Sequence, residues 1–353
     1  MKTLAEILEK IEGPDEAARA ACRVQWDGLA KPLGSLGRME DAIARIAAVT
    51  GNPNVALPRR TLLVLCADNG VVAQGVTQVD SSITAIVARS LAIGESTVCR
   101  MAGPVNCQVI PVDMGILDFE PTPGVWDRRV RNSTGDITQG PAMTREECIR
   151  AIELGADLVR VCREDGASIV GTGEMGIGNT TTSSAVAAVL LGKNPAEVTG
   201  RGAGLSDEGL ARKLASIERA LAHNGPDPRD PVDVIAKVGG LDIAGLCGVF
   251  LGGALYRVPV LVDGFISGAA ALCAARLCPR AGFAMQASHV SAEPAGRMML
   301  DALGLEPLIS AGMRLGEGSG AVAALPLLDM ALSVYQSGQT FSHIGMDAYT
   351  PQS

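Results

Sequence analysis

Residues 171–185 read GTGEMGIGNTTTSSA, and this stretch decides the fold of the chain. It follows the apolar run Ala167–Val170, which predicts the end of a β-strand, and it leads into Ala185–Leu191, which predicts a helix. Glycines at a strand-to-helix turn let the backbone approach an anion, and the helix N-terminus adds free N–H groups and a positive dipole end. The turn therefore predicts a phosphate cradle, with Thr180–Thr182 as caps or donors and the Glu174 carboxylate beside it.

The same stretch matches the dinucleotide-binding pattern G-x-G-x-x-G through Gly171, Gly173 and Gly176. Two features favour a monophosphate instead. Glu174 would bring a negative charge into the pyrophosphate turn. The acid about 20 residues further on, Glu197, lies in a glycine-rich stretch with no clear strand. A purely structural turn, whose glycines serve close packing, is the third interpretation.

The composition favours helices layered on a buried parallel sheet. Of 353 residues, 47% are hydrophobic, 3% are aromatic and 42 are glycine, so Ala, Val, Leu and Ile must fill the core. We therefore predict an α/β fold with a Rossmann-like parallel sheet flanked by helices. A net charge of −8, without basic runs or many aromatic residues, argues against nucleic-acid binding.

Cysteine and histidine usage gives no metal signature. The nine cysteines form no C-x-x-C pair and the three histidines lack metal-ligand spacing, so we expect reduced thiols and no zinc site. The first twenty residues predict a charged amphipathic helix rather than a signal peptide, and the apolar runs are interrupted before membrane-spanning length. A cytoplasmic protein without a membrane segment is expected.

A strand, a glycine-rich turn and a helix follow one another repeatedly along the chain. Besides Ala167–Val170, the predicted strands are Thr61–Ala67, Cys107–Val112, Val258–Asp263 and Phe283–Ala287. The predicted helices are Thr3–Glu12, Pro14–Ala30, Met39–Thr50, Ile83–Ala92, Thr144–Glu164, Asp242–Leu255 and a C-terminal helix to about Tyr335. Residues 116–142, rich in Pro, Gly and charge, predict a long surface excursion.

Small or polar residues follow five predicted strands. They are Asp68, Glu174, Asp263, Ser288–Ser291 and Glu317. Because ligand sites in open parallel sheets form at the carboxyl ends of the strands, we expect these residues to line one pocket. Glu317 is flanked by two glycines, and dry surroundings would raise its pKa and suit a general base. Capping of the following helix is the alternative, and spacing alone leaves both open.

Eight ordered motifs carry a family resemblance. They are KPLGSLGR (Lys31–Arg38), CADNGV (Cys66–Val71), GEMGIGNTTT (Gly173–Thr182), GRGAGL (Gly200–Leu205), KVGGLDIAGL (Lys237–Leu246), VDGFIS (Val262–Ser267), SHVSAEP (Ser288–Pro294) and MRLGEGSGA (Met313–Ala321). Together they resemble the nicotinate-nucleotide–dimethylbenzimidazole phosphoribosyltransferases, and the resemblance extends from about Leu8 to Tyr335.

The resemblance implies an activity and a domain organisation. Members of this family transfer 5-phosphoribosyl from nicotinate mononucleotide to an aromatic base, giving an α-nucleotide and nicotinate, without a metal or redox cofactor. Homodimers are usual. A large α/β domain, here residues 59–320, is joined to a small helical domain built from both chain ends, here residues 1–58 and 321–353. The family's catalytic base corresponds to Glu317.

Further site residues are expected beside that base. For the phosphoribosyl group they are Gly176, Gly178, Asn179, Thr180, Gly202, Gly204, Lys213, Asp242, Asp263 and Ser291. For the base they are Val79, Asp80, Ser81, Val87, Met175 and Leu315. Glu174 is expected to orient the ribose or the donor ring. Lys213 could instead be a solvated helix lysine, and Asp242 and Asp263 could be caps at strand ends.

Some positions depart from the family pattern. Asp68-Asn69-Gly70 stands where many relatives have Asp-His-Gly, SHVSAEPAG lacks basic residues found in other forms, and Val87 replaces a polar amide in some members. The acceptor therefore stays open among benzimidazoles, purines and phenols. A nucleotide-dependent oxidoreductase, and a non-catalytic subunit that pairs with a paralogue, are the alternatives from other classes.

Overall fold

A computed structural model describes residues 1–350 of the chain. The strands are β1 Arg60–Ala67, β2 Cys107–Gly115, β3 Trp126–Asp127, β4 Ile169–Met175, β5 Val260–Val262 and β6 Met285–Ala287. The α-helices are α1 Leu4–Lys10, α2 Glu16–Asp27, α3 Arg38–Thr50, α4 Ser82–Ala92, α5 Thr97–Ala102, α6 Arg145–Glu164, α7 Asn179–Leu191, α8 Pro195–Val198, α9 Asp207–Asn224, α10 Pro231–Val238, α11 Leu241–Tyr256, α12 Phe265–Leu277, α13 Gly296–Leu303 and α14 Ser319–Ser337. Short 3-10 helices are η1 Gly70–Gln74, η2 Gly103–Val105, η3 Pro279–Ala284 and η4 Ser342–Ile344.

The six strands form one sheet in the order β3-β2-β1-β4-β5-β6, and every pairing is parallel. The chain begins the sheet at its middle with β1, runs outward to β3, and then returns to build the other half from β4. This order is that of the Rossmann fold, and its reversal between β1 and β4 is the point where such sheets bind ligands. The predicted α/β class is confirmed.

The sheet is covered on both faces, as its continuous apolar strands require. Alternate side chains of β1 enter two different cores. Leu63 and Leu65 join a cluster with α6, α7, α11 and α12, whereas Leu62 and Val64 join a second cluster with α3, α5 and α14. Both clusters consist almost entirely of aliphatic side chains, in agreement with the low aromatic content.

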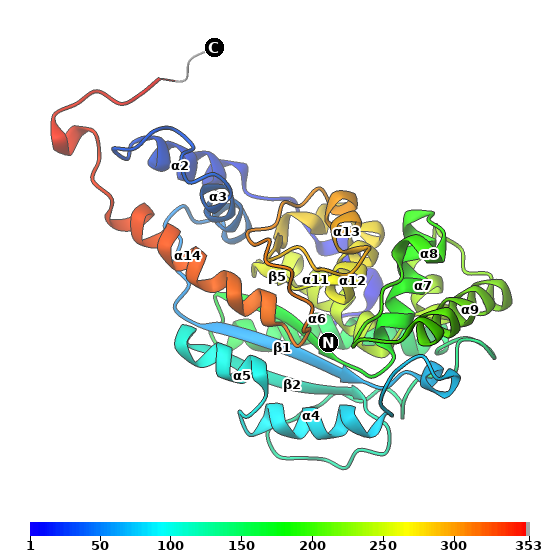
Figure 1. Cartoon of the computed structure of the whole chain (residues 1–353). Helices are drawn as coiled ribbons and strands as arrows, with labels where there is room; N and C mark the ends of the chain where they lie inside the picture. Colours follow the sequence, from blue (N-terminus) through cyan, green and yellow to red (C-terminus); the bar gives the residue numbers. More distant parts are fainter. Residues whose placement is uncertain (351–353) are drawn as a thin grey trace.

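Helices from the two ends of the chain pack together. Figure 1 shows α2, α3 and α14 gathered at one end of the molecule and α7, α8 and α9 at the other. Leu29 and Thr340 form an isolated antiparallel bridge. Trp26 is fully buried, and its ring lies 4.9 Å from that of Tyr335. The second core cluster contains both rings together with the β1 side chains, so it runs across the predicted boundaries at residues 58 and 320, which stay a prediction.

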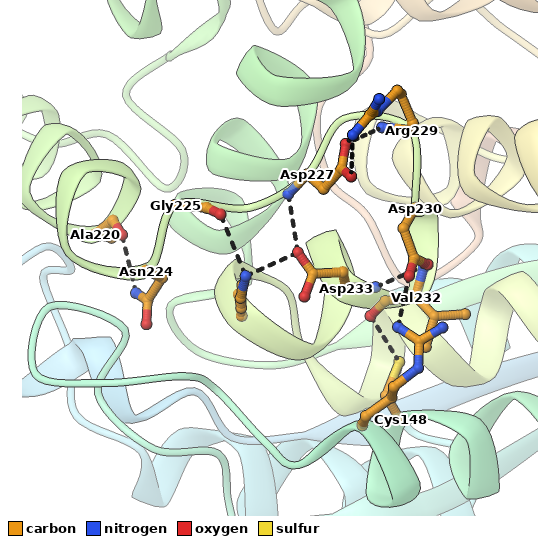
Figure 2. A network of polar contacts seen from close by, with 11 residues as sticks. Cys148, Ala220, Asn224, Gly225, Asp227, Arg229, Asp230, Val232 and Asp233 are labelled. Atoms are coloured by element: carbon orange, nitrogen blue, oxygen red, sulfur yellow. Dashed lines mark hydrogen bonds and ion pairs between the residues drawn. The ribbon is translucent and has the colours of Figure 1, made fainter.

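Lys237, which begins the motif KVGGLDIAGL, holds the connection between α9 and α10. Figure 2 shows the residues of this connection, among them Gly225, Asp227 and Asp233. The Lys237 ammonium donates to the Gly225 carbonyl at 3.2 Å and pairs with Asp233 at 3.0 Å. Asp233 in turn accepts from the Asp227 backbone N–H at 2.8 Å. Asp230 caps α10 through the N–H groups of the second and third helical residues. This part of the motif is therefore structural.

The structure corrects two boundaries. β4 extends to Met175, five residues beyond the predicted strand end at Val170, and α7 begins at Asn179 rather than near Ala185. The predicted surface excursion over residues 116–142 is wrong in part, because Ile116, Phe119 and Ile137 are buried in it.

Candidate active site

A cleft of about 240 Å³ opens at the carboxyl ends of β4, β5 and β6 and at the N-terminus of α7. It is lined by Glu174–Ile177, Asn179, Thr180, Gly202, Ala203, Asp263–Ser267, His289, Ser291, Glu293 and Arg314–Glu317. These segments are far apart in the sequence, and the parallel sheet brings them to one edge. Glu174, Asp263, residues of the stretch Ser288–Ser291 and Glu317 converge here as expected. Asp68 does not, because it is fully buried and accepts hydrogen bonds from Thr84 and the Leu117 N–H instead.

Glu317 lies on the loop before α14, and not at the end of a strand as predicted. Its backbone is supported by β4, because a Cβ at Gly173 would lie 2.6 Å from the Glu317 carbonyl oxygen. Gly316, Glu317 and Gly318 all have positive φ angles, of 84°, 58° and 85°. Left-handed backbone is common for glycine but rare for a glutamate, so the surrounding fold must impose it.

The Glu317 carboxylate is half-buried and faces the cleft, and its Oε2 atom has no hydrogen-bond partner among the described residues. Burial raises the pKa of this carboxyl, while the Val98 N–H and the Ser96 hydroxyl act to lower it. A carboxylate with a raised pKa and a free oxygen is suited to accept a proton from a bound molecule.

Glu174 and Asp242 share one amide. Asn179 Nδ2 donates to the Glu174 carboxylate and, at 2.9 Å, to Asp242 Oδ2. Burial, followed by the charge of Asp242, raises the pKa of Glu174 to about 8. Burial likewise raises the pKa of Asp242 to about 6. Two buried carboxyls on one donor do not both ionise readily, so Glu174 holds a proton at neutral pH.

Asp263 serves the helix that follows Glu317. Its Oδ1 accepts from the N–H groups of Gly320 at 2.7 Å and Ala321 at 3.0 Å, at the start of α14. Burial raises the pKa of Asp263 to about 7, although several backbone N–H groups act to lower it. The capping role weighed for this residue is thus present, while the side chain also lines the cleft.

A buried cation contacts the cleft wall without itself lining the cleft. Lys213 on α9 is fully buried, so the solvated-lysine interpretation is wrong. Its ammonium donates to Thr180 Oγ1 at 2.8 Å and lies beside Gly202, both of which line the cleft. Burial lowers the pKa of Lys213 to about 8, although the charge of Glu293 acts to raise it. A buried ammonium with one hydroxyl partner is suited to hold an anion.

Comparison with known proteins agrees with this arrangement. The sequence profile of a family described as "Phosphoribosyltransferase" matches residues 11–346. A nicotinate-nucleotide–dimethylbenzimidazole phosphoribosyltransferase from Acetivibrio thermocellus is 45% identical over 326 residues, which are 92% of this chain and 93% of that protein. A protein of the same name from Ruminiclostridium cellulolyticum is 42% identical over 349 residues, 99% of each chain. The crystal structure of CobT from Thermus thermophilus has a TM-score of 0.89 at 38% identity, covering 94% of this chain and 100% of that one.

The chain belongs to the nicotinate-nucleotide–dimethylbenzimidazole phosphoribosyltransferase family. The match spans every segment of the cleft, from Glu174 to Glu317. The glycine-rich stretch Gly171–Ala185 therefore contributes to a phosphoribosyltransferase fold. Gly171 and Gly173 lie inside β4 rather than in a turn, which removes the geometry that a dinucleotide fingerprint needs.

Not every residue expected from the resemblance to this phosphoribosyltransferase family lines the cleft. Met175, Leu315, Gly176, Asn179, Thr180, Gly202 and Ser291 do. Asp242 is fully buried behind Asn179, Gly178 is the N-cap of α7, and Gly204 lies against Gln78, and none of the three is in the cleft lining.

The expected base-binding residues before and within α4 lie apart from this cleft. Val79 and Asp80 line a separate surface hollow. Ser81 lies close to the Asp68 carboxyl and acts to lower its pKa, which burial raises. Val87 packs against the second core cluster.

Several cleft residues were given no role of their own by the sequence patterns. His289, inside the predicted stretch Ser288–Ser291, is buried, and burial lowers its pKa; its Nδ1 lies 3.2 Å from the Ser288 hydroxyl. Ser267, Arg314 and Glu293 also line the cleft, and the Ser267 hydroxyl has no partner among the described residues. The motifs VDGFIS, SHVSAEP and MRLGEGSGA contain all four, but nothing in their spacing singled them out.

A larger hollow lies elsewhere. A depression of about 630 Å³ is lined by residues of the N-terminus, α6 and Tyr256. Its charged lining side chains are exposed, and it touches none of the strand ends. We therefore place the chemistry at the smaller cleft.

Among the described residues, no helix has the length and apolar character needed to cross a membrane.

Proposed function

We propose that this chain transfers the 5-phosphoribosyl group of nicotinate mononucleotide to 5,6-dimethylbenzimidazole or a related aromatic base, giving the α-ribazole 5′-phosphate and nicotinate. One observation carries the proposal. A single cleft is lined by a carboxylate with an unpartnered oxygen, Glu317, and by Thr180, whose hydroxyl accepts from the buried ammonium of Lys213 just outside the lining. The names of the relatives supply the two substrates.

The reaction has a simple electron balance. The bond between C1′ of the ribose and the pyridinium nitrogen breaks, and its electron pair returns to nicotinate, which leaves as a neutral pyridine ring. A lone pair on one nitrogen of the base forms the new bond to C1′. The proton on the other nitrogen then passes to Glu317, whose negative charge also favours the cationic adduct as it forms. Attack from the face opposite the leaving ring converts the β-donor into an α-product.

Other residues in the cleft, and Lys213 beside it, are suited to bind and orient the donor. Lys213, Thr180, Gly202 and Ser291 are suited to the 5′-phosphate, since a charge-assisted bond from a buried ammonium is stronger than one in water. A protonated Glu174 can donate a hydrogen bond that orients the ribose or the donor ring. Holding both reactants in one cleft removes much of the entropic cost of their encounter.

The acceptor is the least determined part of the proposal. Met175 and Leu315 offer apolar surface to a flat ring and no hydrogen bond that would select one azole. Glu317 can deprotonate a phenol as well as an azole, so purines and phenols such as p-cresol are alternative acceptors.

We further propose that the enzyme is cytoplasmic and works as a homodimer, with a heterodimer formed with a paralogue as the alternative.

The test is nicotinate release from nicotinate mononucleotide with a panel of benzimidazoles, purines and phenols, with products identified by mass. Turnover by the purified chain with at least one acceptor is expected. Glu317→Gln should retain donor affinity and lose turnover by roughly 10²–10⁴-fold, the usual contribution of a general base. No nicotinate release with any acceptor would favour the non-catalytic subunit, and full turnover by Glu317→Gln would exclude the assigned base.

A further inference from the structure

A second hollow, of about 260 Å³, lies between the helices α2 and α3 and the segment that follows α13. Four arginines line it, Arg19, Arg23, Arg38 and Arg45, together with the carboxylates of Asp41 and Glu306. We call it the arginine hollow. It shares no lining residue with the candidate active site.

The positive charge in the arginine hollow exceeds the negative charge. Arg23 forms an ion pair with Asp41. Arg38 pairs with Glu306 at 3.1 Å, but Glu306 is also bound by Arg297 at 2.9 Å. Arg19 pairs at 3.0 Å with Glu16, a largely exposed carboxylate outside the lining. Each of the two lining carboxylates is thus already engaged, and Arg45 is the one arginine of the lining without an ion pair among the described residues.

Arg45 is the least satisfied of the four. It forms no ion pair among the described residues, and its one hydrogen bond reaches the Gly282 carbonyl at 3.4 Å, near the limit for such a bond. A guanidinium has five N–H donors. Arg45 and Arg19 line the same hollow. Burial lowers the pKa of Arg45, and the charge of Arg19 lowers it further, while the charge of Asp41 acts to raise it.

Arginines held together without enough carboxylates are stabilised by an added anion. The planar fork of a guanidinium donates two parallel hydrogen bonds to a phosphate, and several forks around one hollow can surround a group with many acceptor oxygens. A buried amide, Gln286 on β6, also lines the hollow; its Nε2 donates to the Ala287 carbonyl at 3.3 Å, which leaves its second N–H free for a ligand.

We propose that the arginine hollow binds a small phosphate-bearing anion, held chiefly by Arg45 and Arg19 and completed by Arg23 and Arg38. Such a ligand would connect α3 to the segment 304–307, which Arg38 already reaches through the Glu306 carboxylate and, at 2.8 Å, through the Pro307 carbonyl. The proposal does not depend on the proposed reaction.

The test is calorimetric titration of the full chain with inorganic pyrophosphate and, in a second arm, with ADP, at low and physiological salt. Because the active site also offers a phosphate subsite, the titrations are made with wild type and with Lys213→Met, Arg45→Gln and Arg19→Gln. The Lys213→Met chain is expected to retain one pyrophosphate site. Arg45→Gln and Arg19→Gln are each expected to weaken pyrophosphate binding at this site at least tenfold. Arg229→Gln, which removes an exposed cation between α9 and α10, should leave that site unchanged.

The arms separate the outcomes. Pyrophosphate binding that exceeds ADP binding assigns a free anion, and the reverse assigns a nucleotide; either supports the site if it depends on Arg45. Pyrophosphate binding that Lys213→Met abolishes and Arg45→Gln leaves intact would overturn the proposal. Citrate is titrated in the same way as a non-phosphate anion. An Arg45-dependent site that binds citrate as tightly as pyrophosphate would also overturn the proposal, because the ligand class would then be wrong. If Arg45→Gln unfolds, the Arg19→Gln chain decides.

Discussion

Glu317 combines a functional side chain with a backbone conformation that side chains rarely adopt. A non-glycine residue with positive φ costs on the order of 1 kcal/mol or more, and the close contact with Gly173 keeps this residue there. The strain and the function therefore meet at one position, as they often do in catalytic loops.

Replacing Glu317 separates the effect of the strained backbone on stability from the effect of the carboxylate on turnover. We expect Glu317→Gly to abolish turnover and to be more stable than Glu317→Ala by about 1 kcal/mol, because only glycine adopts this φ freely. Both variants lack the carboxylate, so the comparison isolates the backbone. Urea unfolding and nicotinate release measure the two effects. Equal stability of the glycine and alanine variants would show that the loop is not strained.

Lys213 gives a second prediction at this scale. Lys213→Met keeps most of the side-chain volume and removes a buried charge, so its unfolding free energy should equal or exceed that of the wild type. Donor affinity should fall by roughly 10–100-fold, the loss of a hydrogen bond to a charged group. In the wild type, KM for the donor should rise above about pH 8, where the lowered pKa deprotonates the ammonium. A methionine variant with unchanged KM would contradict the phosphate role.

At the scale of elements, the helix α14 depends on a residue that follows the strand β5. Asp263, after β5, accepts from the first N–H groups of a helix that starts 56 residues later in the chain. Asp263→Ala should cost about 0.5–2 kcal/mol as the loss of a cap. It should also lower turnover, because Glu317 lies just before α14. Asp263→Asn, which keeps the acceptor oxygen, should recover most of both. Comparable losses in the two variants would exclude capping as the cause.

Elements were predicted well where a periodic apolar pattern is long. The predicted ranges for α6, α11 and the apolar part of β1 differ from the structure by at most one residue at each end. Glycine-rich segments were predicted less well. Gly171 and Gly173 read as a turn, but they lie inside β4, where the absence of a side chain admits Ala321 and the backbone of Glu317. Only the tertiary contact explains them.

Dependence on tertiary contacts also limits how much of the candidate site can be predicted from the sequence. Glu317, Thr180 and Met175 could be placed from motifs, because each lies in a stretch with a recognisable pattern. His289 lay within the predicted stretch Ser288–Ser291 but received no role of its own, since a lone histidine carries no spacing signal and its position in the cleft comes from the β6 edge. Val87 was expected near the base, yet one face of α4 packs on the sheet and takes this side chain with it.

At the scale of the whole molecule, buried carboxyls make stability depend on pH. Burial raises the pKa of Glu174 to about 8, of Asp263 to about 7 and of Asp242 to about 6. Each binds its proton more tightly in the folded chain than in the unfolded chain, where the pKa is near 4. Their contribution to stability is therefore complete below about pH 4 and is lost as the pH rises to about 8.

Glu174→Gln should flatten this dependence. We expect the unfolding free energy of the wild type to fall from pH 5 to pH 8 more steeply than that of the glutamine variant, which has no proton to lose at this position. The exposed Glu9→Gln serves as a matched control and should keep the wild-type slope. Urea titrations at four pH values measure the slopes. Parallel curves for wild type and Glu174→Gln would mean that Glu174 is ionised throughout.

The packing of the two chain ends has a spectroscopic consequence. The chain has two tryptophans, and Trp26 is enclosed between the Tyr335 ring and the Lys31 ammonium, which lies 5.2 Å from the indole centre. With Trp126 replaced by phenylalanine, the fluorescence of the protein comes from one buried indole at the junction of α2 and α14. A red shift of its emission then reports separation of these helices, in real time and without a label.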